Sequence, residues 1–235
     1  MNMDNILIVV PARGGSTGIP KKNIMDICGR PLIWYTLDYI RLLGLQLQSV
    51  VITDCDEIEK CVHNSGINIR VLREPYVASS DENTIRAVYR AIKQTESLYD
   101  PFKKIVLLQP TQPIRPLDII HRCLDALGEN NDSSLTVNAP CVPRHLYVKQ
   151  DTGGIIENLR DWTIRQEADT HSIINGICFA YLRNMFDEEP KCLRDFHANR
   201  TYKAIEIDSF PIVDINYIQD IEWFKYLLLN GHTMW

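Results

Sequence analysis

A glycine-rich loop that ends in two lysines is the first stretch of the chain with residues able to do chemistry. It contains Gly14, Gly15 and Gly18 and ends in Lys21 and Lys22. Glycines let backbone N–H groups approach an anion closely, and the lysine ammonium groups supply positive charge. The loop matches neither the Walker pattern nor G-x-G-x-x-G. These residues predict a phosphate-binding loop, and a flexible connection with a solvated basic tip is the alternative.

The loop follows a continuous apolar run at residues 6–10. Such a run is typical of a strand that is buried on both faces of a parallel sheet. In open α/β sheets, ligands bind beyond the carboxyl ends of the strands. We therefore expect the loop to lie at the binding edge of such a sheet.

The rest of the chain alternates short apolar runs with amphipathic stretches, which predicts an α/β fold with a doubly wound, mainly parallel sheet. Further strands are expected at residues 49–54, 69–73, 104–109, 134–138, 177–182 and 203–208. Helices are expected at residues 31–43, 56–65, 81–96, 116–127 and 220–230. The alternation stops at residues 139–172, where prolines and glycines recur. We expect a single domain over residues 1–235 with a small irregular insertion there.

The composition is that of a soluble globular protein, with 45% hydrophobic and 23% charged residues. A net charge of −5 provides no basic surface, so nucleic acid is not expected as a partner. The seven cysteines are scattered and form no C-x-x-C pair, which argues against a disulfide framework and a zinc site. With no apolar stretch long enough for a membrane span, we expect a cytoplasmic protein without a membrane partner.

The first loop closely resembles the start of the acylneuraminate (CMP-sialic acid synthetase-like) cytidylyltransferases. Their pattern is roughly Pro/Leu-Ala-Arg-x-x-Ser-Lys-Gly-Ile/Leu-Pro-x-Lys-Asn. The matching positions here are Ala12, Arg13, Ser16, Gly18, Ile19, Pro20, Lys22 and Asn23. The resemblance implies a Rossmann-like fold of the nucleotide-diphospho-sugar transferase type.

Other motifs of this family recur in the same order over nearly the whole chain. They are Thr53-Asp54, residues 72–75 with Ala78-Ser79 and Thr84, residues 107–115 (Leu-Leu-Gln-Pro-Thr-Gln-Pro-Ile-Arg), Arg165-Gln166, Asn175-Gly176 and residues 214–220. In such enzymes the anomeric hydroxyl of a 2-keto sugar acid attacks the α-phosphorus of CTP, and pyrophosphate leaves. Nucleotidyl transfer of this kind depends on positioning and on neutralising charge at the phosphorus.

The resemblance also implies which residues carry the reaction. The expected catalytic residues are Lys22, Arg13 and Asp214, with Lys22 nearest the reacting α-phosphate. The nucleotide would be bound by Ala12, Arg13, Gly14, Gly15, Ser16, Lys22, Asn23, Arg73 and Thr84. The acceptor sugar would be bound by Gln109, Arg165 and Asn175. A Mg²⁺ ion would be held by Asp214 and Asn216 together with the substrate phosphates.

Each of these residue types also has a purely structural interpretation. Lys22 fits a solvated surface lysine, and Arg73 fits a surface ion pair with a neighbour such as Glu74. Gln109 fits a buried side chain that caps backbone groups. Without the family motifs, the residue types leave both interpretations open.

The late acidic motif and two other positions depart from the family pattern. Asn216 stands where the family has a second aspartate, and Thr17 stands where it usually has lysine. Ile173-Ile174 replaces the Arg-Pro of some sialic acid enzymes, which leaves the identity of the sugar open. Asp214 also fits a helix cap, and Asp220 is expected to be one because it begins the apolar pattern of the last helix.

The sequence thus predicts a nucleotidyltransferase that uses CTP and Mg²⁺ and acts on a nine-carbon acid of the sialic, legionaminic or pseudaminic type. One alternative is an eight-carbon keto-deoxy acid as acceptor, although the Lys22-Asn23 ending and the Gln109 motif match the sialate branch better. Another is a nucleotide-binding module impaired in catalysis, to which Thr17 and Asn216 would contribute. The family's relatives are dimers in which the irregular segment crosses to the partner, so a homodimer is expected.

Overall fold

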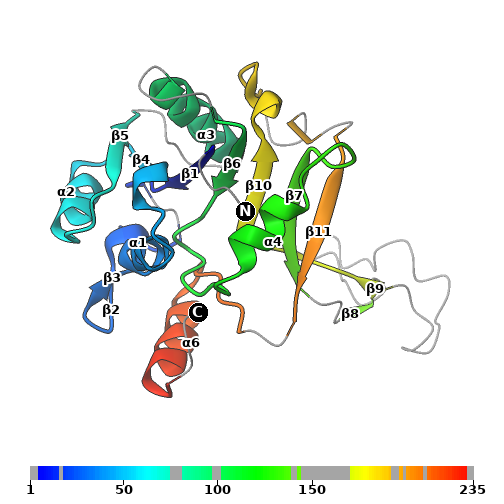
Figure 1. Cartoon of the computed structure of the whole chain (residues 1–235). Coiled ribbons are helices and arrows are strands. Elements are labelled where there is room, and N and C mark those ends of the chain that lie inside the picture. The colour runs from blue at the N-terminus through cyan, green and yellow to red at the C-terminus, as the bar shows by residue number, and fades with distance from the viewer. Residues whose placement is uncertain are drawn as a thin grey trace, which may run out of the picture.

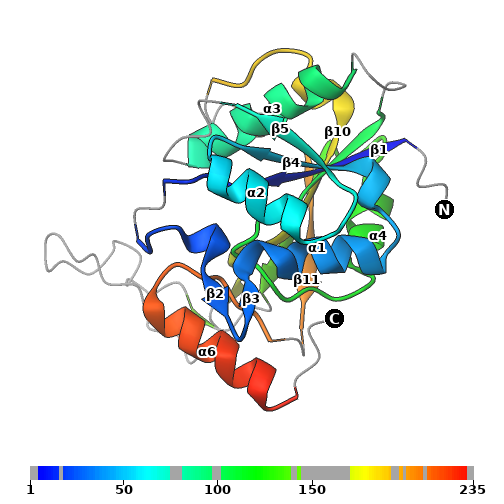
Figure 2. The ribbon, with the colours of Figure 1, turned by 90° about the vertical axis from the view of Figure 1, so that its left-hand side faces the viewer.

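The computed structural model describes most of the chain (Figures 1 and 2). The described residues are 5–15, 18–74, 81–96, 102–138, 142–143, 170–191, 196–197, 200–208 and 211–231. Two of the predicted site residues, Ser16 and Arg165, lie outside them, as do Thr17 and most of the expected insertion at 139–172.

A seven-stranded sheet forms the centre of the molecule. Its strands, in spatial order, are β11 (Tyr202–Ile207), β7 (Ser133–Asn138), β10 (Ile174–Leu182), β6 (Lys104–Leu107), β1 (Ile6–Pro11), β4 (Ser49–Thr53) and β5 (Arg70–Arg73). All neighbours pair in parallel except β10, which runs antiparallel to both β6 and β7. The predicted mainly parallel α/β sheet is therefore confirmed. Its first strand lies inside the sheet, as the apolar run at residues 6–10 indicated.

Helices cover both faces of this sheet (Figures 1 and 2). Helices α1 (Leu32–Leu42), α2 (Asp56–Asn64) and α4 (Ile119–Asp125) contribute to one core cluster, and α3 (Asp81–Glu96) contributes to a second. Three short 3₁₀ turns, η1 (Lys22–Ile24), η2 (Gln46–Gln48) and η4 (Arg183–Phe186), complete the connections between described elements. None of the helices in the described part of the chain is long and apolar enough to cross a membrane.

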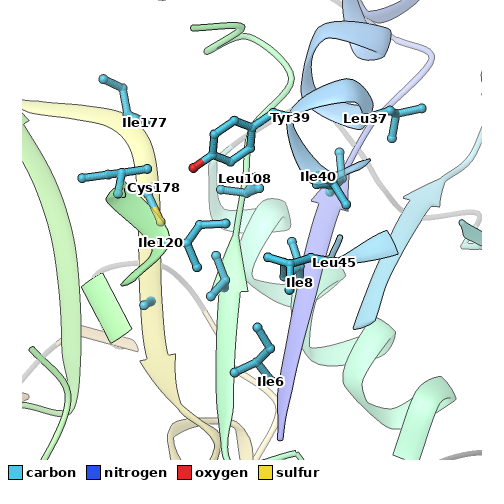
Figure 3. Packing of buried hydrophobic residues seen from close by; sticks show 14 of the residues in the cluster. Ile6, Ile8, Leu37, Tyr39, Ile40, Leu45, Leu108, Ile120, Ile177 and Cys178 are labelled. Carbon is cyan, nitrogen blue, oxygen red and sulfur yellow. The ribbon is translucent and has the colours of Figure 1, made fainter. Parts of the chain in front are cut away.

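The two clusters are divided by the alternation of side chains along β1. Ile6, Ile8 and Val10 belong to the cluster of α1, α2 and α4, whereas Leu7 and Val9 belong to the cluster of α3. Successive side chains of a strand point to opposite faces, so an all-apolar strand fits only between two covered faces. Figure 3 shows Ile6 and Ile8 in the first cluster, together with Ile40 of α1. Strand β1 is therefore buried on both faces almost up to the start of the glycine-rich loop.

The last helix, α6 (Ile218–Leu229), packs below the sheet beside a small hairpin, β2 (Asp26–Ile27) and β3 (Arg30–Pro31) (Figure 2). The ring of Phe224 meets the ring of Tyr35 edge-on, with 4.9 Å between the centroids. The Tyr35 hydroxyl donates a 2.6 Å hydrogen bond to the Ile27 carbonyl. This third core cluster connects the end of the chain to the loop after β1.

Two expectations for the elements are corrected by the structure, and one further element was not expected. The helix expected at 116–127 spans only Ile119–Asp125, because the Pro116 carbonyl closes a turn by accepting the Ile119 N–H. The strand expected at 177–182 begins earlier, at Ile174. The β2–β3 hairpin was not predicted; its turn residues Cys28 and Gly29 have φ of 54° and 82°, and the apolar pattern does not reveal such a short pair.

The structure describes only residues near the two ends of the expected insertion. Strand β8 (Val142–Pro143) pairs antiparallel with β9 (Thr170–His171). Figure 1 places this two-stranded sheet beyond the β7 and β11 side of the central sheet. The two ends of the segment are thus held together.

Candidate active site

The predicted phosphate-binding loop leaves the carboxyl end of β1 and is held by the end of β4. The backbone N–H of Gly14 donates a 2.7 Å hydrogen bond to Oδ1 of Asp54, which follows β4. The N–H of Ala12 donates to the Ile52 carbonyl at 2.9 Å, and Ala12 is buried. A Cβ atom at Gly14 would lie 2.7 Å from Cβ of Cys55, whereas one at Gly15 would meet nothing within 4 Å. Gly14 is therefore required for packing, and exposed Gly15 is not.

Asn23 closes the same loop from its other end. Its side chain is buried, and Nδ2 donates a 3.0 Å hydrogen bond to the carbonyl of Arg13. The preceding Lys21 has a left-handed backbone, with φ of 53°, and its exposed ammonium pairs with Glu57. Asn23 thus shapes the loop, and a direct contact of Asn23 with the nucleotide stays a prediction.

Arg13 presents an unused donor inside this loop. Its Nη1 is buried and has no hydrogen-bond partner among the described residues. A buried N–H without an acceptor costs about 1–3 kcal/mol, and a bound oxyanion would remove that cost. The arrangement fits an anion-binding guanidinium.

Lys22 reaches from the first loop to the loop before α6. Its Nζ donates a 2.6 Å hydrogen bond to the carbonyl of Ile215 and lies 3.4 Å from Oδ1 of Asn216. Burial lowers the pKa of Lys22, the attraction of Asp214 partly opposes this, and the charge of Arg13 lowers the pKa further. Arg13 and Asp214 both act electrostatically on Lys22, and the interpretation of Lys22 as a solvated surface lysine is not what the structure shows.

Asp214, on the same late loop, is the carboxylate that raises the pKa of Lys22 most. It keeps an exposed surface, yet its enclosure by protein atoms raises its pKa, against hydrogen bonds from Asn216 and Thr111. Oδ2 accepts a 2.7 Å hydrogen bond from Nδ2 of Asn216. No group of three or more His, Cys, Asp or Glu side chains in the described ranges is arranged to hold a metal ion. A metal here would need ligands from the substrate.

Asp220 caps the last helix, as predicted. Its Oδ2 accepts the backbone N–H groups of Asn216 at 2.8 Å and Tyr217 at 2.7 Å. The carboxylate stands in the first turn of α6 rather than at the residue before it, and it satisfies donors that the helix leaves unpaired. The Asp220 carboxylate also holds the loop that carries Asp214 and Asn216.

The predicted sugar-binding residues Gln109 and Asn175 lie where β6 ends and antiparallel β10 begins, with the Gln109 side chain beside Gly176, the residue that follows Asn175. A Cβ at Gly176, whose φ is 73°, would lie 3.3 Å from Oε1 of half-buried Gln109 and 3.5 Å from Nε2 of Gln112. Oδ1 of Asn175 accepts the Thr136 hydroxyl at 2.5 Å and the N–H of Ile177 at 3.1 Å.

Several amide groups at this edge are left without partners. Nδ2 of Asn175, Oε1 of Gln112 and Oδ1 of Asn138 are buried and unpaired within the described residues. Because unpaired buried polar atoms are rare in folded proteins, they mark this edge as a place where a polar ligand would bind. Gln112 and Asn138 were not predicted as site residues. Gln112 lies inside the motif at residues 107–115, which was the available signal, whereas Asn138 ends β7 in no motif.

Arg115, in the same motif as Gln109, has a role that the sequence analysis missed. It is fully buried and donates to the carbonyls of Ile177 at 3.1 Å and Gln109 at 2.6 Å, and to the Thr36 hydroxyl at 3.0 Å. Burial lowers its pKa to about 10. Arg115 therefore holds the backbone of Gln109 to β10, and its place in an apolar, proline-rich run was the available indication of burial.

Arg73, at the end of β5, makes surface ion pairs, but not with the expected partner. It pairs with Asp56 at 2.8 Å and Glu59 at 3.7 Å, and it donates to the Asp54 carbonyl at 3.0 Å. Glu74 instead is buried and lies 3.8 Å from a different arginine, Arg90. Asp56 and Glu59 belong to α2, the helix that precedes β5, so that helix and not the neighbour in sequence supplies the acids.

Three predicted site residues remain, and the structure describes one of them. Thr84 lies half-buried on α3. Ser16 and Arg165 fall outside the described residues, and their roles stay predictions. The structure thus brings together Arg13, Lys22, Asp214 and Asn216. Gln109 lies just beyond β6, and Asn175 lies on the adjacent strand β10.

Comparison with known proteins finds similarity to the class of enzyme that the sequence motifs indicated. The model of the cytidylyltransferase family matches residues 7–155. Among curated proteins, a pseudaminic acid cytidylyltransferase of Campylobacter jejuni is 28% identical over 96% of this chain and 97% of its own length. The CMP-N,N'-diacetyllegionaminic acid synthase of Legionella pneumophila is 30% identical over 57% of each chain.

Among solved structures, a CMP:2-keto-3-deoxy-manno-octonic acid synthetase complexed with CTP superposes with a TM-score of 0.71 at 18% identity, covering 97% of this chain and 99% of that one. This similarity shows the shared fold. The family model, in contrast, extends over more than half of the sequence. The chain is therefore a member of the cytidylyltransferase family.

Proposed function

We propose that this cytidylyltransferase transfers CMP from CTP to the anomeric hydroxyl of a nine-carbon 2-keto sugar acid. The observation that carries the proposal is the joining of the first loop to the late acidic loop by Lys22, beside a sheet edge with unpaired amides. The pseudaminic and legionaminic acid enzymes among the relatives support this acceptor class. Sialic, legionaminic and pseudaminic acids are the candidates.

The chemistry of this step is an in-line displacement at the α-phosphorus. The sugar hydroxyl oxygen attacks and gives up its proton, and the bond to the α–β bridging oxygen breaks, so that pyrophosphate leaves with the bonding electrons. Arg13 and Lys22 neutralise the charge that builds up around the phosphorus. Arg73 and Thr84 bind the nucleoside side, and Gln109, Asn175 and Arg165 bind the acid.

Mg²⁺ is part of the proposal. One exposed carboxylate, Asp214, fits an ion that is held jointly with the triphosphate, which is a usual arrangement for Mg²⁺. When bound, the ion would neutralise phosphate charge and orient the leaving group. The protein's own contribution is to place Asp214 next to Lys22.

The wider setting of the enzyme is also proposed. The described cysteines are free thiols, which supports a reducing cytoplasm. We place residues 139–172 at the interface of a homodimer, as an insertion within one domain spanning residues 1–235. Size measurement of the full chain and of a variant lacking residues 144–169 would test the dimer.

An eight-carbon keto-deoxy acid is the second candidate acceptor, because the CTP-complexed structural neighbour is named for such an acid. The experiment is a panel of eight- and nine-carbon keto-deoxy acids with CTP and Mg²⁺, read by pyrophosphate release. We expect the wild-type protein to release pyrophosphate with a nine-carbon acid. We expect Asp214→Ala to release none at any Mg²⁺ concentration. Release only with the eight-carbon acid would select the second candidate. Saturable CTP binding without any release would point to a nucleotide-binding module.

A further inference from the structure

The amide of Asn216 bridges a cation and an anion. Its Nδ2 donates to Oδ2 of Asp214 at 2.7 Å, and its Oδ1 lies 3.4 Å from Nζ of Lys22. The same ammonium donates a shorter hydrogen bond, 2.6 Å, to the carbonyl of Ile215. Lys22, Asn216 and Asp214 thus form one hydrogen-bonded chain across two loops.

The backbone of Asn216 is held from several sides, so this bridge is built into the fold. A Cβ atom at Gly18 would lie only 2.8 Å from the Asn216 carbonyl oxygen, which shows how closely the two loops pack. The N–H of Asn216 donates to Asp220 at 2.8 Å, and the N–H of Ile215 donates to the Thr111 carbonyl at 2.9 Å. The exposed side chain of Asn216 is held in turn by its hydrogen bonds to Asp214 and Lys22.

The bridge uses the oxygen atoms that a metal ion would need. Oδ1 of Asn216 and the Ile215 carbonyl face the Lys22 ammonium, and Oδ2 of Asp214 accepts the Asn216 amide. Mg²⁺ and its close mimic Mn²⁺ require several oxygen ligands, and each extra carboxylate strengthens their binding. Only one carboxylate, Asp214, belongs to the chain Lys22–Asn216–Asp214.

We propose that Asn216 makes the Lys22 ammonium the resident cation of this site, so that a divalent ion binds only together with the nucleotide and not to the free protein. Asn216 is then a positioning residue rather than a metal ligand, in contrast to the expectation from the family motif. The proposal deepens the proposed function and rests on it for the role of the ion. An aspartate at 216 would pair with Lys22 directly and add a second carboxylate beside Asp214.

The test is Mn²⁺ binding to the full, nucleotide-free chain, measured by the loss of the free-ion electron paramagnetic resonance signal. For the wild-type chain we expect no binding tighter than about 1 mM. Asn216→Asp should bind Mn²⁺ at least about tenfold more tightly. The matched control is Asn68→Asp, which adds the same charge at an exposed position before β5, at the opposite edge of the sheet.

Two results would overturn the proposal. One is tight Mn²⁺ binding by the wild-type chain that disappears in Asp214→Ala. The other is an Asn216→Asp chain that melts like the wild type and binds Mn²⁺ no better than Asn68→Asp does. If Asn216→Asp fails to fold, the Mn²⁺ titrations of the wild-type chain and of Asp214→Ala still test the proposal. The Mn²⁺ measurement needs neither CTP nor a sugar acid. A failure of the proposed function, seen as no pyrophosphate release in the acceptor panel, can therefore be distinguished from a failure of this proposal.

Discussion

The backbone N–H of Gly14 donates a 2.7 Å hydrogen bond to the carboxylate of Asp54, and these two residues follow the neighbouring parallel strands β1 and β4. The bond holds the first turn of the predicted phosphate-binding loop against the sheet. Cys55 lies directly behind Gly14, which leaves no space for a side chain there. The shape of the loop therefore depends on a residue 40 positions away.

Replacing Gly14 by alanine tests this dependence. The new Cβ would lie 2.7 Å from Cβ of Cys55, so the loop or Cys55 must move. We expect Gly14→Ala to lower the free energy of unfolding by about 1–3 kcal/mol and to weaken CTP binding, measured by denaturation and by calorimetry. Gly15→Ala, with nothing within 4 Å of its Cβ, is the control for stability. Equal stability of the two variants would contradict the packing argument.

Lys22→Ala should impair turnover far more than nucleotide binding. Its ammonium belongs to the cluster with Asp214, and charge stabilisation lost at a reacting phosphate typically costs about 10²–10³ in kcat. CTP affinity should change less, because Arg13 and the loop backbone remain. Lys21→Ala is the control, since that exposed lysine pairs with Glu57. Unchanged kcat in Lys22→Ala would remove Lys22 from the transition state.

Arg115→Lys should loosen the edge that carries Gln109. Lysine cannot reproduce the fork that donates to Gln109, Ile177 and Thr36, and each buried acceptor left without a donor costs about 1–3 kcal/mol. We expect a lower midpoint in urea and a higher KM for the sugar acid, with a smaller change in KM for CTP. A destabilised variant with an unaltered sugar acid KM would show that Arg115 supports the core alone.

Asn175→Asp tests the sugar side directly. An aspartate keeps the acceptor for Thr136 and Ile177 but replaces the unpaired Nδ2 by a negatively charged oxygen. Repulsion of the acceptor's carboxylate should raise its KM at least about tenfold, equivalent to about 1.4 kcal/mol, while KM for CTP stays within about twofold. The melting temperature has to be followed as well. An unchanged sugar acid KM would place Asn175 outside the sugar site.

The ion pair between Glu96 and Arg183 predicts a pH dependence of stability. The hydrogen bond from Arg183 lowers the pKa of Glu96, so the folded state binds this proton less readily than the unfolded state does. The stabilisation is then complete above the unfolded pKa of about 4.3 and is lost as the pH falls through the lower folded pKa.

Glu96→Gln should therefore cost about 1–2 kcal/mol at pH 7, and the difference from the wild type should shrink below about pH 4. Urea unfolding between pH 3 and pH 7 measures it. Glu222→Gln, which removes an exposed pair with Lys225, is the control and should have little effect at any pH. A constant difference across this range would mean that Glu96 acts through packing.

Much of the architecture and the family were readable in the sequence alone. The apolar run at residues 6–10 predicted a strand covered on both faces, because a strand without polar positions has no face to show to water. The order of motifs from Arg13 to Asp214 predicted the family. Both depend on local patterns, which a single chain displays directly.

The contacts that make the site were decided by tertiary structure. Lys22 meets Ile215 across 193 positions, and no local spacing connects them. Arg73 pairs with Asp56 and Glu59 and not with its neighbour Glu74, because successive residues of a strand face opposite sides.

The same holds for Arg115 and Asn216, whose types alone suit a surface arginine and a metal ligand. Arg115 is buried and donates a hydrogen bond to the backbone carbonyl of Gln109, and the side chain of Asn216 bridges Lys22 and Asp214. The sequence by itself determined the residue types and the strand that ends at the site. Only the folded chain decided which charges face one another, because that depends on where distant loops come to lie.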